Sequence, residues 1–321
     1  MIMPLLLLAV LLPGAPAAPQ ALHPLCADAP TPVLFAQWDT QLENLAFDGA
    51  GGLYVSDLGG DRLLLANRSG ALSVVDEVAG MHGMAFGPDG HLFVGATSHD
   101  GTPGVWRYST TPPTAGARVE VASGLQAANG MAFDAAGNLF VSSPLSTQGP
   151  YLVKLPADDM AAWQPWTDTY GPNGLVLMAD GGLLAAITAD QSSPLMRFST
   201  SAPDAPSTVA ELSFGAATLQ PGVHAPSGPL TVVPKGLDDL TIAPDGFAYA
   251  TAHVTGELLR VDLATGDACA WANGFEEPTS VRVANGFDTW AGYLFVTDMG
   301  GVGVTALAGP GAGAIWAVPL A

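Results

Sequence analysis

The chain repeats one phrase, which reads LAFDGAGGLYVSD at Leu45–Asp57, MAFGPDGHLFVGA at Met84–Ala96 and MAFDAAGNLFVSS at Met131–Ser143. In each copy, apolar residues occupy every second position on both sides of a short turn that contains glycine. Period-2 spacing around such a turn is typical of a β-hairpin. The repeated phrase therefore predicts a series of antiparallel hairpins rather than helices.

Three further copies follow at Leu175–Ile187, Leu240–Ala252 and, with a longer turn, Val281–Asp298. The copies start 39, 47, 44, 65 and 41 residues apart. Strand-rich repeats of this length are typical of β-propellers, and two more strand-like pieces after each hairpin complete four strands per blade. The sequence therefore predicts an all-β fold, a six-bladed β-propeller with four-stranded blades.

The last blade lacks one strand, because its third strand, Ala314–Val318, lies at the end of the chain. The segment Val33–Trp38 precedes the first repeat and has no other partner. We expect this N-terminal strand to complete the last blade as its outer strand, which closes the ring and leaves no edge open. The alternative, two separate β-sandwiches, needs a linker in the middle of the chain, and none is evident.

Composition indicates a globular protein and limits its partners. Of 321 residues, 49% are apolar and only 12% are charged, so the chain can bury a large core. The 29 acidic residues against 9 basic ones give a net charge of -20. Such a surface repels phosphate, which argues against nucleic acid and anionic membranes as partners. Cations and neutral small molecules remain.

The N-terminal region has the pattern of a secretory signal peptide. An apolar run, Ile2–Leu12, precedes the small-residue stretch Gly14–Ala18, although no Lys or Arg stands in front of the run. The run is too short to span a bilayer, and its alternative is a short buried segment. We therefore expect a signal peptide over residues 1–18, a single propeller domain over residues 19–321, and secretion to the extracellular space or periplasm.

Two cysteines, Cys26 and Cys269, remain in the expected mature chain. In an oxidising compartment an even count favours a disulfide, and the alternative is two unpaired buried thiols. A bridge between them would join the two ends of the fold.

One register position is polar in every repeat. Two residues before the first apolar residue of each copy stand Glu43, His82, Asn129, Asn173, Asp238 and Thr279. The first strand of each propeller blade lines the central channel, so we expect these side chains to face the axis at one mouth. The alternative is that Asn and Asp simply begin strands as turn residues.

Two carboxylates and two amide oxygens at such a mouth form a hard oxygen site. These ligands suit calcium, whereas zinc prefers nitrogen and sulfur. Two buried carboxylates without a cation would also be costly.

Residues that end the second strand of each hairpin should surround the same mouth, among them Asp57, His99, His253 and Asp298. His82 and His99 flank one hairpin, and Asp238 and His253 flank another. A histidine beside a metal-bound water or an ester can act as a general base. The alternative for each is a packed or surface imidazole.

This constellation resembles the calcium-dependent six-bladed propeller hydrolases, namely paraoxonase, diisopropylfluorophosphatase and the senescence-marker/gluconolactonase group. The resemblance covers the chain from about Val33 onward. It implies one catalytic calcium ion held by Glu43, Asn129, Asn173 and Asp238. The pair His82-Gly83, His99 and His253 match histidine positions of the paraoxonase branch.

The chain also departs from these families. Paraoxonases have acids for a second, structural calcium where this chain has Asn44 and Gly130, so the resemblance does not extend to a second ion. Asp239 follows Asp238 where the families have Asn or Gly, and adds charge to the site. The stretch Val94–Gly101 lacks the arginine with which gluconolactonases hold sugar, which favours less polar lactones and esters.

The resemblance implies a secreted calcium-dependent hydrolase of lactones or aryl esters, a monomer that acts on a small molecule and has no nucleic acid partner or membrane span. His82, oriented by His99, is the expected base, with Asp238 as an alternative base or nucleophile. Expected substrate contacts are His253, Asp57 and Asp298. Three alternatives stay open: a gluconolactonase-type sugar lactonase, a non-catalytic ligand- or protein-binding propeller, and a strictosidine-synthase-like condensing enzyme. The loop 215–237 is either a lid or an inert insertion.

Overall fold

The computed structural model describes residues 22–98, 100–144, 146, 149–188, 190, 192–200, 202–215, 224–225, 228–229, 232–233, 235–300 and 312–320. The predicted signal peptide and His99 lie outside the described residues, as does most of the loop 215–237.

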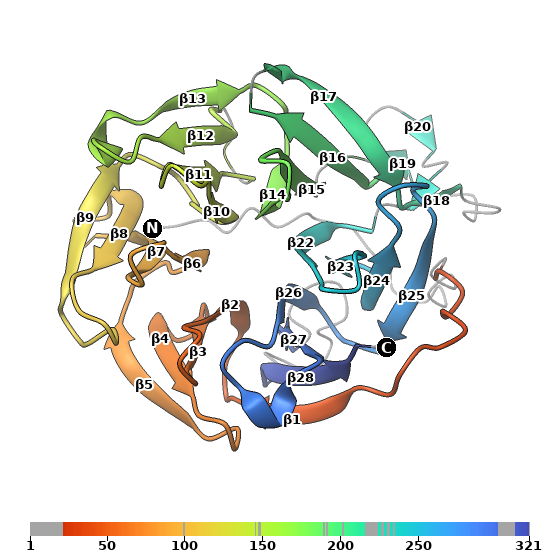
Figure 1. Cartoon of the computed structure of the whole chain (residues 1–321), viewed down its shortest axis with the longest axis horizontal. Helices are drawn as coiled ribbons and strands as arrows, with labels where there is room; N and C mark the ends of the chain where they lie inside the picture. Colours follow the sequence, from red (N-terminus) through yellow and green to blue (C-terminus); the bar gives the residue numbers. More distant parts are fainter. Residues whose placement is uncertain are drawn as a thin grey trace.

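Six four-stranded antiparallel sheets surround a common centre, which confirms the predicted six-bladed propeller (Figure 1). From the inner strand outward, the blades are β2 (Leu42–Phe47), β3 (Leu53–Asp57), β4 (Arg62–Ala66) and β5 (Leu72–Glu77); β6 (Met84–Phe86), β7 (Leu92–Thr97), β8 (Pro103–Tyr108) and β9 (Arg118–Ser123); β10 (Met131–Phe133), β11 (Leu139–Ser142), β12 (Leu152–Leu155) and β13 (Gln164–Thr167); β14 (Pro172–Leu177), β15 (Leu183–Ile187), β16 (Pro194–Ser199) and β17 (Ala202–Glu211); β22 (Leu237–Ile242), β23 (Ala248–Ala252), β24 (Glu257–Val261) and β25 (Ala268–Asn273); and β26 (Pro278–Val283), β27 (Tyr293–Asp298), β28 (Ala314–Pro319) and β1 (Val33–Gln37).

Other elements are small. Two short strand pairs join β18 (Phe214–Gly215) to β21 (Val232–Val233) and β19 (His224–Ala225) to β20 (Gly228–Pro229). The helical elements described are two 3-10 turns, η1 (Met160–Ala162) and η2 (Asp288–Trp290). In the part of the chain that the structure describes, no helix has the length and apolar character needed to cross a membrane.

Local chemistry explains why the repeated phrase folds as a hairpin. In the first blade Leu45 pairs with Val55 and Phe47 pairs with Leu53, so the alternating apolar residues share one face. The Asp48 carboxylate closes the turn by accepting hydrogen bonds from the backbone N–H of Ala50 at 2.7 Å and of Gly52 at 2.8 Å. An aspartate that binds the backbone ahead of it is a common way to stabilise a tight turn.

The core lies between neighbouring blades. Leu184 and Leu195 of the fourth blade pack with Leu240 and Leu259 of the fifth, and all four side chains are buried. The same kind of packing joins the first blade to the last, where Leu45 belongs to one cluster with Phe295. Because each sheet buries its faces against its neighbours, the blades hold one another in a ring.

The ring closes as the sequence predicts. Strand β1 pairs antiparallel with β28, so the N-terminal strand is the outer strand of the last blade. The predicted disulfide between Cys26 and Cys269 is present and spans 243 residues of sequence. Beside it, the Cys26 N–H donates to the Ala270 carbonyl at 2.9 Å, which fastens the N-terminal segment to β25.

Candidate metal and active site

The predicted ring residues occupy irregular positions at the starts of the inner strands. Register shifts interrupt the ladder between Leu42 and Leu45, between Pro172 and Leu175, and between Leu237 and Leu240. Glu43, Asn173 and Asp238 lie inside these shifts. A β-bulge changes the direction of a side chain relative to the regular pleat. At these three positions the side chain is therefore not bound to alternate between the two faces of the blade.

Glycines bring neighbouring inner strands close together at this level. A Cβ on Gly83 would lie 1.5 Å from the carbonyl oxygen of Asn129, and a Cβ on Gly130 would lie 2.0 Å from that of Asn173. A Cβ on Gly174 would lie 2.4 Å from Cα of Asp239. A side chain at any of the three would therefore force adjacent blades apart.

One pair of ring residues joins the first and third blades. The Asn129 amide donates to Glu43 Oε1 at 3.1 Å, and Asn129 Oδ1 accepts a hydrogen bond from the Asn44 amide at 3.3 Å. Glu43 is 5% exposed and Asn129 is 7% exposed. The second oxygen of Glu43, Oε2, is buried without a hydrogen-bond partner.

A second pair joins the fourth and fifth blades. The Asn173 amide donates to Asp238 Oδ1 at 2.6 Å. Asn173 is buried, and its Oδ1 has no hydrogen-bond partner. Burial raises the pKa of Asp238 well above its usual range, and the Glu43 and Asp239 carboxylates raise it further. Burial also raises the pKa of Glu43, to about 7. The charge of one pair therefore acts on the other.

The donor set fits a hard cation. Two carboxylates and two amides supply oxygen, and the unpartnered Glu43 Oε2 and Asn173 Oδ1 are buried acceptors that an ion would satisfy. Within the described part of the chain, no three His, Cys, Asp or Glu side chains group as a metal site. An ion here would therefore need the amide oxygens as well as Glu43 and Asp238.

The histidines differ in their placement. The His82 side chain is partly buried at the start of the second blade, and burial lowers its pKa, so the imidazole is neutral at pH 7. His253 Nδ1 lies 3.8 Å from Asp238 Oδ2 and has no hydrogen-bond partner. Burial lowers the pKa of His253 as well, against the opposing effect of Glu277 and Asp298. The predicted pairing of His82 with His99 stays a prediction.

Asp57 has a structural role that the sequence did not indicate. Its carboxylate is fully buried and accepts hydrogen bonds from Trp38 Nε1 at 2.9 Å, Thr40 Oγ1 at 2.5 Å, the Gly60 N–H at 2.8 Å and Arg62 Nε at 2.6 Å. These contacts tie the segment after β1 to the first blade. Both oxygens are occupied, so nothing in the structure supports the predicted substrate contact.

Asp298 and Thr279 are likewise bound to the protein. The Asp298 carboxylate accepts backbone N–H groups of Glu276 at 3.0 Å, Glu277 at 2.9 Å and Gly300 at 3.2 Å. The Thr279 hydroxyl donates to the Glu43 carbonyl at 2.6 Å, so its side chain fastens the last blade to the first. Of the six ring positions, the structure joins Glu43 to Asn129 and Asn173 to Asp238, and Thr279 braces the last blade against the first.

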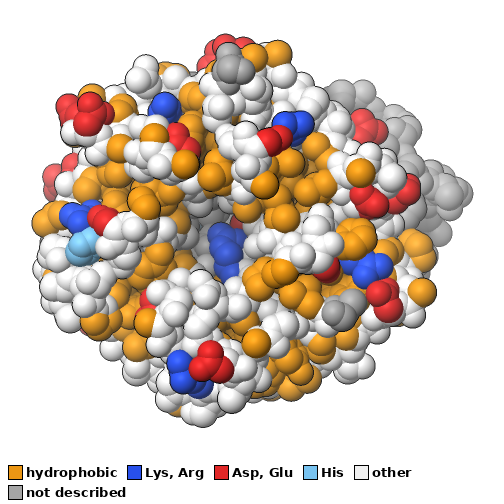
Figure 2. Space-filling view, viewed as in Figure 1, with side chains coloured by type: hydrophobic (Ala, Val, Ile, Leu, Met, Phe, Trp, Pro, Cys, Tyr) orange, Lys and Arg blue, Asp and Glu red, His pale blue; other side chains and the backbone are white. Residues whose placement is uncertain are grey.

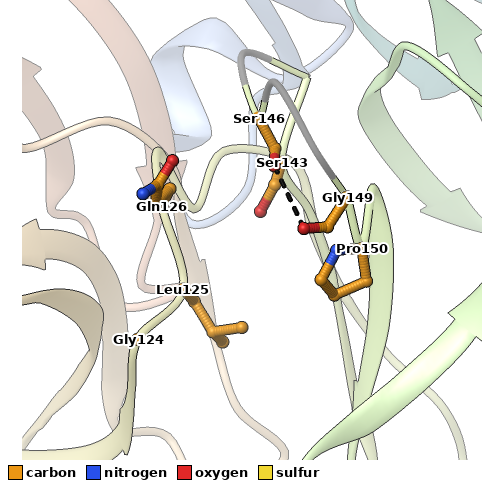
Figure 3. A pocket seen from close by; sticks show the side chains of 7 residues that line it. All are labelled: Gly124, Leu125, Gln126, Ser143, Ser146, Gly149 and Pro150. Atoms are coloured by element: carbon orange, nitrogen blue, oxygen red, sulfur yellow. Dashed lines mark hydrogen bonds between the residues drawn. The ribbon is translucent and has the colours of Figure 1, made fainter.

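A polar pocket adjoins Asn129 and was not expected from the sequence. It has a volume of about 310 Å³, and its lining is Gly124, Leu125, Gln126, Ser143, Ser146, Gly149 and Pro150. Figure 3 shows Gln126 on one wall and Ser143 and Ser146 on the other. Gln126 stands three residues before Asn129 in the chain, and Ser143 follows Ser142, whose carbonyl accepts the Asn129 N–H at 2.9 Å.

A larger hollow of about 620 Å³ lies between the first and second blades. Its lining includes Asp61, Trp106 and Arg118, but none of the ring residues. We assign it no part in the chemistry of the mouth.

The sequence matches no protein-family model and no curated protein. Solved structures with the same fold include a gluconolactonase from Xanthomonas campestris, with 18% identity, a TM-score of 0.63, and coverage of 96% of this chain and 99% of that chain. A luciferin-regenerating enzyme has 15% identity, a TM-score of 0.64, and coverage of 90% and 95%. A PQQ-bound aldose sugar dehydrogenase from Streptomyces coelicolor has 17% identity, a TM-score of 0.62, and coverage of 89% and 96%. The chain therefore shares its fold with gluconolactonase-like propeller proteins and with sugar dehydrogenases.

Proposed function

We propose that the protein is a calcium-dependent hydrolase of lactones or aryl esters. The observation that carries the proposal is the pairing of Glu43 with Asn129 and of Asn173 with Asp238, with two buried oxygens left unpartnered. The gluconolactonase among the structures of the same fold is consistent with this activity. The charge of the chain, -20, also favours a cation as partner.

When bound, calcium would polarise the carbonyl of the ester and stabilise negative charge on its oxygen. The protein side chains perform the remaining tasks. Asn44 holds the Asn129 amide so that it stays beside Glu43. His82 is neutral at pH 7 and can accept the proton of the attacking water. Asp238 is the alternative base, and His253 lies beside its carboxylate.

The pocket beside Asn129 supports a second candidate, a sugar-lactone hydrolase. Gln126, Ser143 and Ser146 offer an amide and two hydroxyl groups, which suit the hydroxyls of a polyhydroxylated ring. This polar lining opposes the preference for less polar esters that the absence of an arginine in Val94–Gly101 favours. Relative rates on gluconolactone and on phenyl acetate decide between the two candidates.

We also propose that residues 1–18 are a signal peptide and that the mature protein is a secreted monomer. The disulfide between Cys26 and Cys269 supports secretion, because such bonds persist mainly in oxidising compartments.

The test uses the secreted, full mature chain. Hydrolysis of gluconolactone, an aliphatic lactone and phenyl acetate is measured with calcium, with a chelator, and after calcium is restored. Chelation should abolish turnover, and calcium should restore it. Glu43→Gln should lose both calcium binding and activity, whereas Glu120→Gln, on the exposed face of β9, should keep both. Turnover that survives complete chelation contradicts the proposal, and calcium binding without turnover of any ester favours a binding protein.

Comparison of His82→Gln with Asp238→Asn identifies the base. His82→Gln should lower kcat by about 100-fold or more while calcium content stays unchanged. Asp238→Asn should lose calcium as well as activity. Full activity of His82→Gln at normal calcium content removes the histidine from the mechanism.

A further inference from the structure

The six inner strands share a second register position, three residues beyond the polar ring. It is small or uncharged in five blades and basic in the sixth: Ala46, Ala85, Ala132, Val176, Thr241 and Arg282. Arg282 is the only Lys or Arg in the six inner strands, all of which the structure describes.

The Arg282 side chain reaches from β26 to β22, where it contacts Asp239 and the Leu240 carbonyl. Its side chain is 21% exposed, whereas that of Asp239 is 3% exposed. Figure 2 shows basic atoms at the bottom of the hollow in the middle of the ring. The positive charge of Arg282 is therefore held beside Asp239, the chain neighbour of the candidate ligand Asp238.

The guanidinium forms an ion pair with Asp239, the neighbour of Asp238 on β22. Arg282 Nη1 donates to Asp239 Oδ2, and it also donates to the Val281 carbonyl at 2.7 Å. The Ser280 hydroxyl donates to the same Asp239 oxygen at 2.5 Å, and Asp239 Oδ1 accepts the Leu240 N–H at 2.8 Å. Both oxygens of Asp239 are thus occupied, unlike Oε2 of Glu43.

The charges at this end of the channel then suit a single divalent ion. Glu43, Asp238 and Asp239 are three carboxyl groups, and Arg282 supplies one permanent positive charge. One divalent ion would balance the remainder.

We propose that Arg282 is the resident cation of the channel, which pairs with Asp239, keeps that carboxylate from binding metal, and so limits the mouth to one divalent ion. The inference rests on the proposed function, because it concerns the same metal site. Arg282 is a positioning residue: it acts through Asp239 on the ion and does not touch substrate.

The experiment counts calcium ions per chain by native mass spectrometry and by calorimetric titration of chelator-treated protein. Wild type should bind one ion. Arg282→Met, which keeps most of the side-chain length but removes the charge, should bind a second ion, because Asp239 becomes available as a ligand. Arg282→Lys, which keeps the charge, should again bind one. A merely structural role of Arg282 would lower stability without changing the number of ions.

The double variant Asp239→Asn/Arg282→Met is the matched control, because it removes one charge of each sign. It should bind one ion with a Kd within about threefold of wild type, since a neutral pair often replaces a buried ion pair without loss. This variant also decides the question if Arg282→Met alone fails to fold. The inference is overturned if folded Arg282→Met binds one ion at unchanged Kd. It is also overturned if the Kd of the double variant for calcium is tenfold or more above that of wild type. Wild type that binds no calcium overturns the proposed function instead.

Discussion

Glu43 and Asp57 lie on the two strands of one hairpin, but their carboxylates have opposite surroundings. Asp57 accepts hydrogen bonds from three side chains and one backbone N–H, so each of its two carboxylate oxygens has two donors within the protein. Glu43 has one oxygen without a partner. A satisfied buried carboxylate stabilises the fold, whereas an unsatisfied one favours a cation. The same residue class therefore has two roles within one blade.

At the residue scale, Asp57→Asn should lower the free energy of unfolding by about 3 kcal/mol, because it leaves the partly buried Arg62 without its counter-charge. Urea unfolding monitored by circular dichroism measures the loss. Asp39→Asn removes the other, exposed carboxylate near Arg62 and should cost under about 1 kcal/mol. Equal losses in the two variants would contradict the structural role of Asp57.

At the element scale, two devices close the ring. Strand β1 supplies the outer strand of the last blade, and the disulfide fastens the segment before it to β25. The strand buries polar backbone groups of β28 that would otherwise form an open edge, and the disulfide restricts the unfolded chain. The two devices are independent, because they fasten the N-terminal segment to different blades.

The double variant Cys26→Ser/Cys269→Ser should therefore fold and keep the site, but with a free energy of unfolding lower by about 4 kcal/mol, as expected for a cross-link over so long a loop. Guanidinium unfolding of the variant is compared with that of wild type with and without a reductant. Reduced wild type should match the variant. An unchanged midpoint would show that β1 alone closes the ring.

At the scale of the whole molecule, ring closure brings together carboxyl groups from the first and fifth blades. Burial raises the pKa of Glu43 to about 7, above its unfolded value of 4.5, so the folded state without metal binds more protons than the unfolded state between these values. The contribution of Glu43 to stability is therefore lost as the pH rises through this window. A bound cation would reverse the effect, because it favours the charged carboxylate.

The corresponding measurement is thermal unfolding in chelator from about pH 5 to about pH 8, for wild type and for Glu43→Gln. The stability of wild type relative to Glu43→Gln should fall across this range, and the gain from added calcium should grow with pH. Comparison with the variant removes the contributions of the histidines, whose lowered pKa values act in the opposite direction. A difference in stability between wild type and Glu43→Gln that does not change with pH would contradict the raised pKa of the buried Glu43 carboxyl group.

The sequence alone determined the six blades, their hairpins, the closing strand and the pairing of Cys26 with Cys269, because alternation and turn chemistry act between residues close in the chain. It also predicted the ring residues, of which the structure pairs Glu43 with Asn129 and Asn173 with Asp238. Only the tertiary structure decided that Asp57 is bound to its own blade, that a polar pocket adjoins Asn129, and that Arg282 holds Asp239. The partners of a charge come from strands far apart in sequence, so its role follows from the folded neighbourhood rather than from the local pattern.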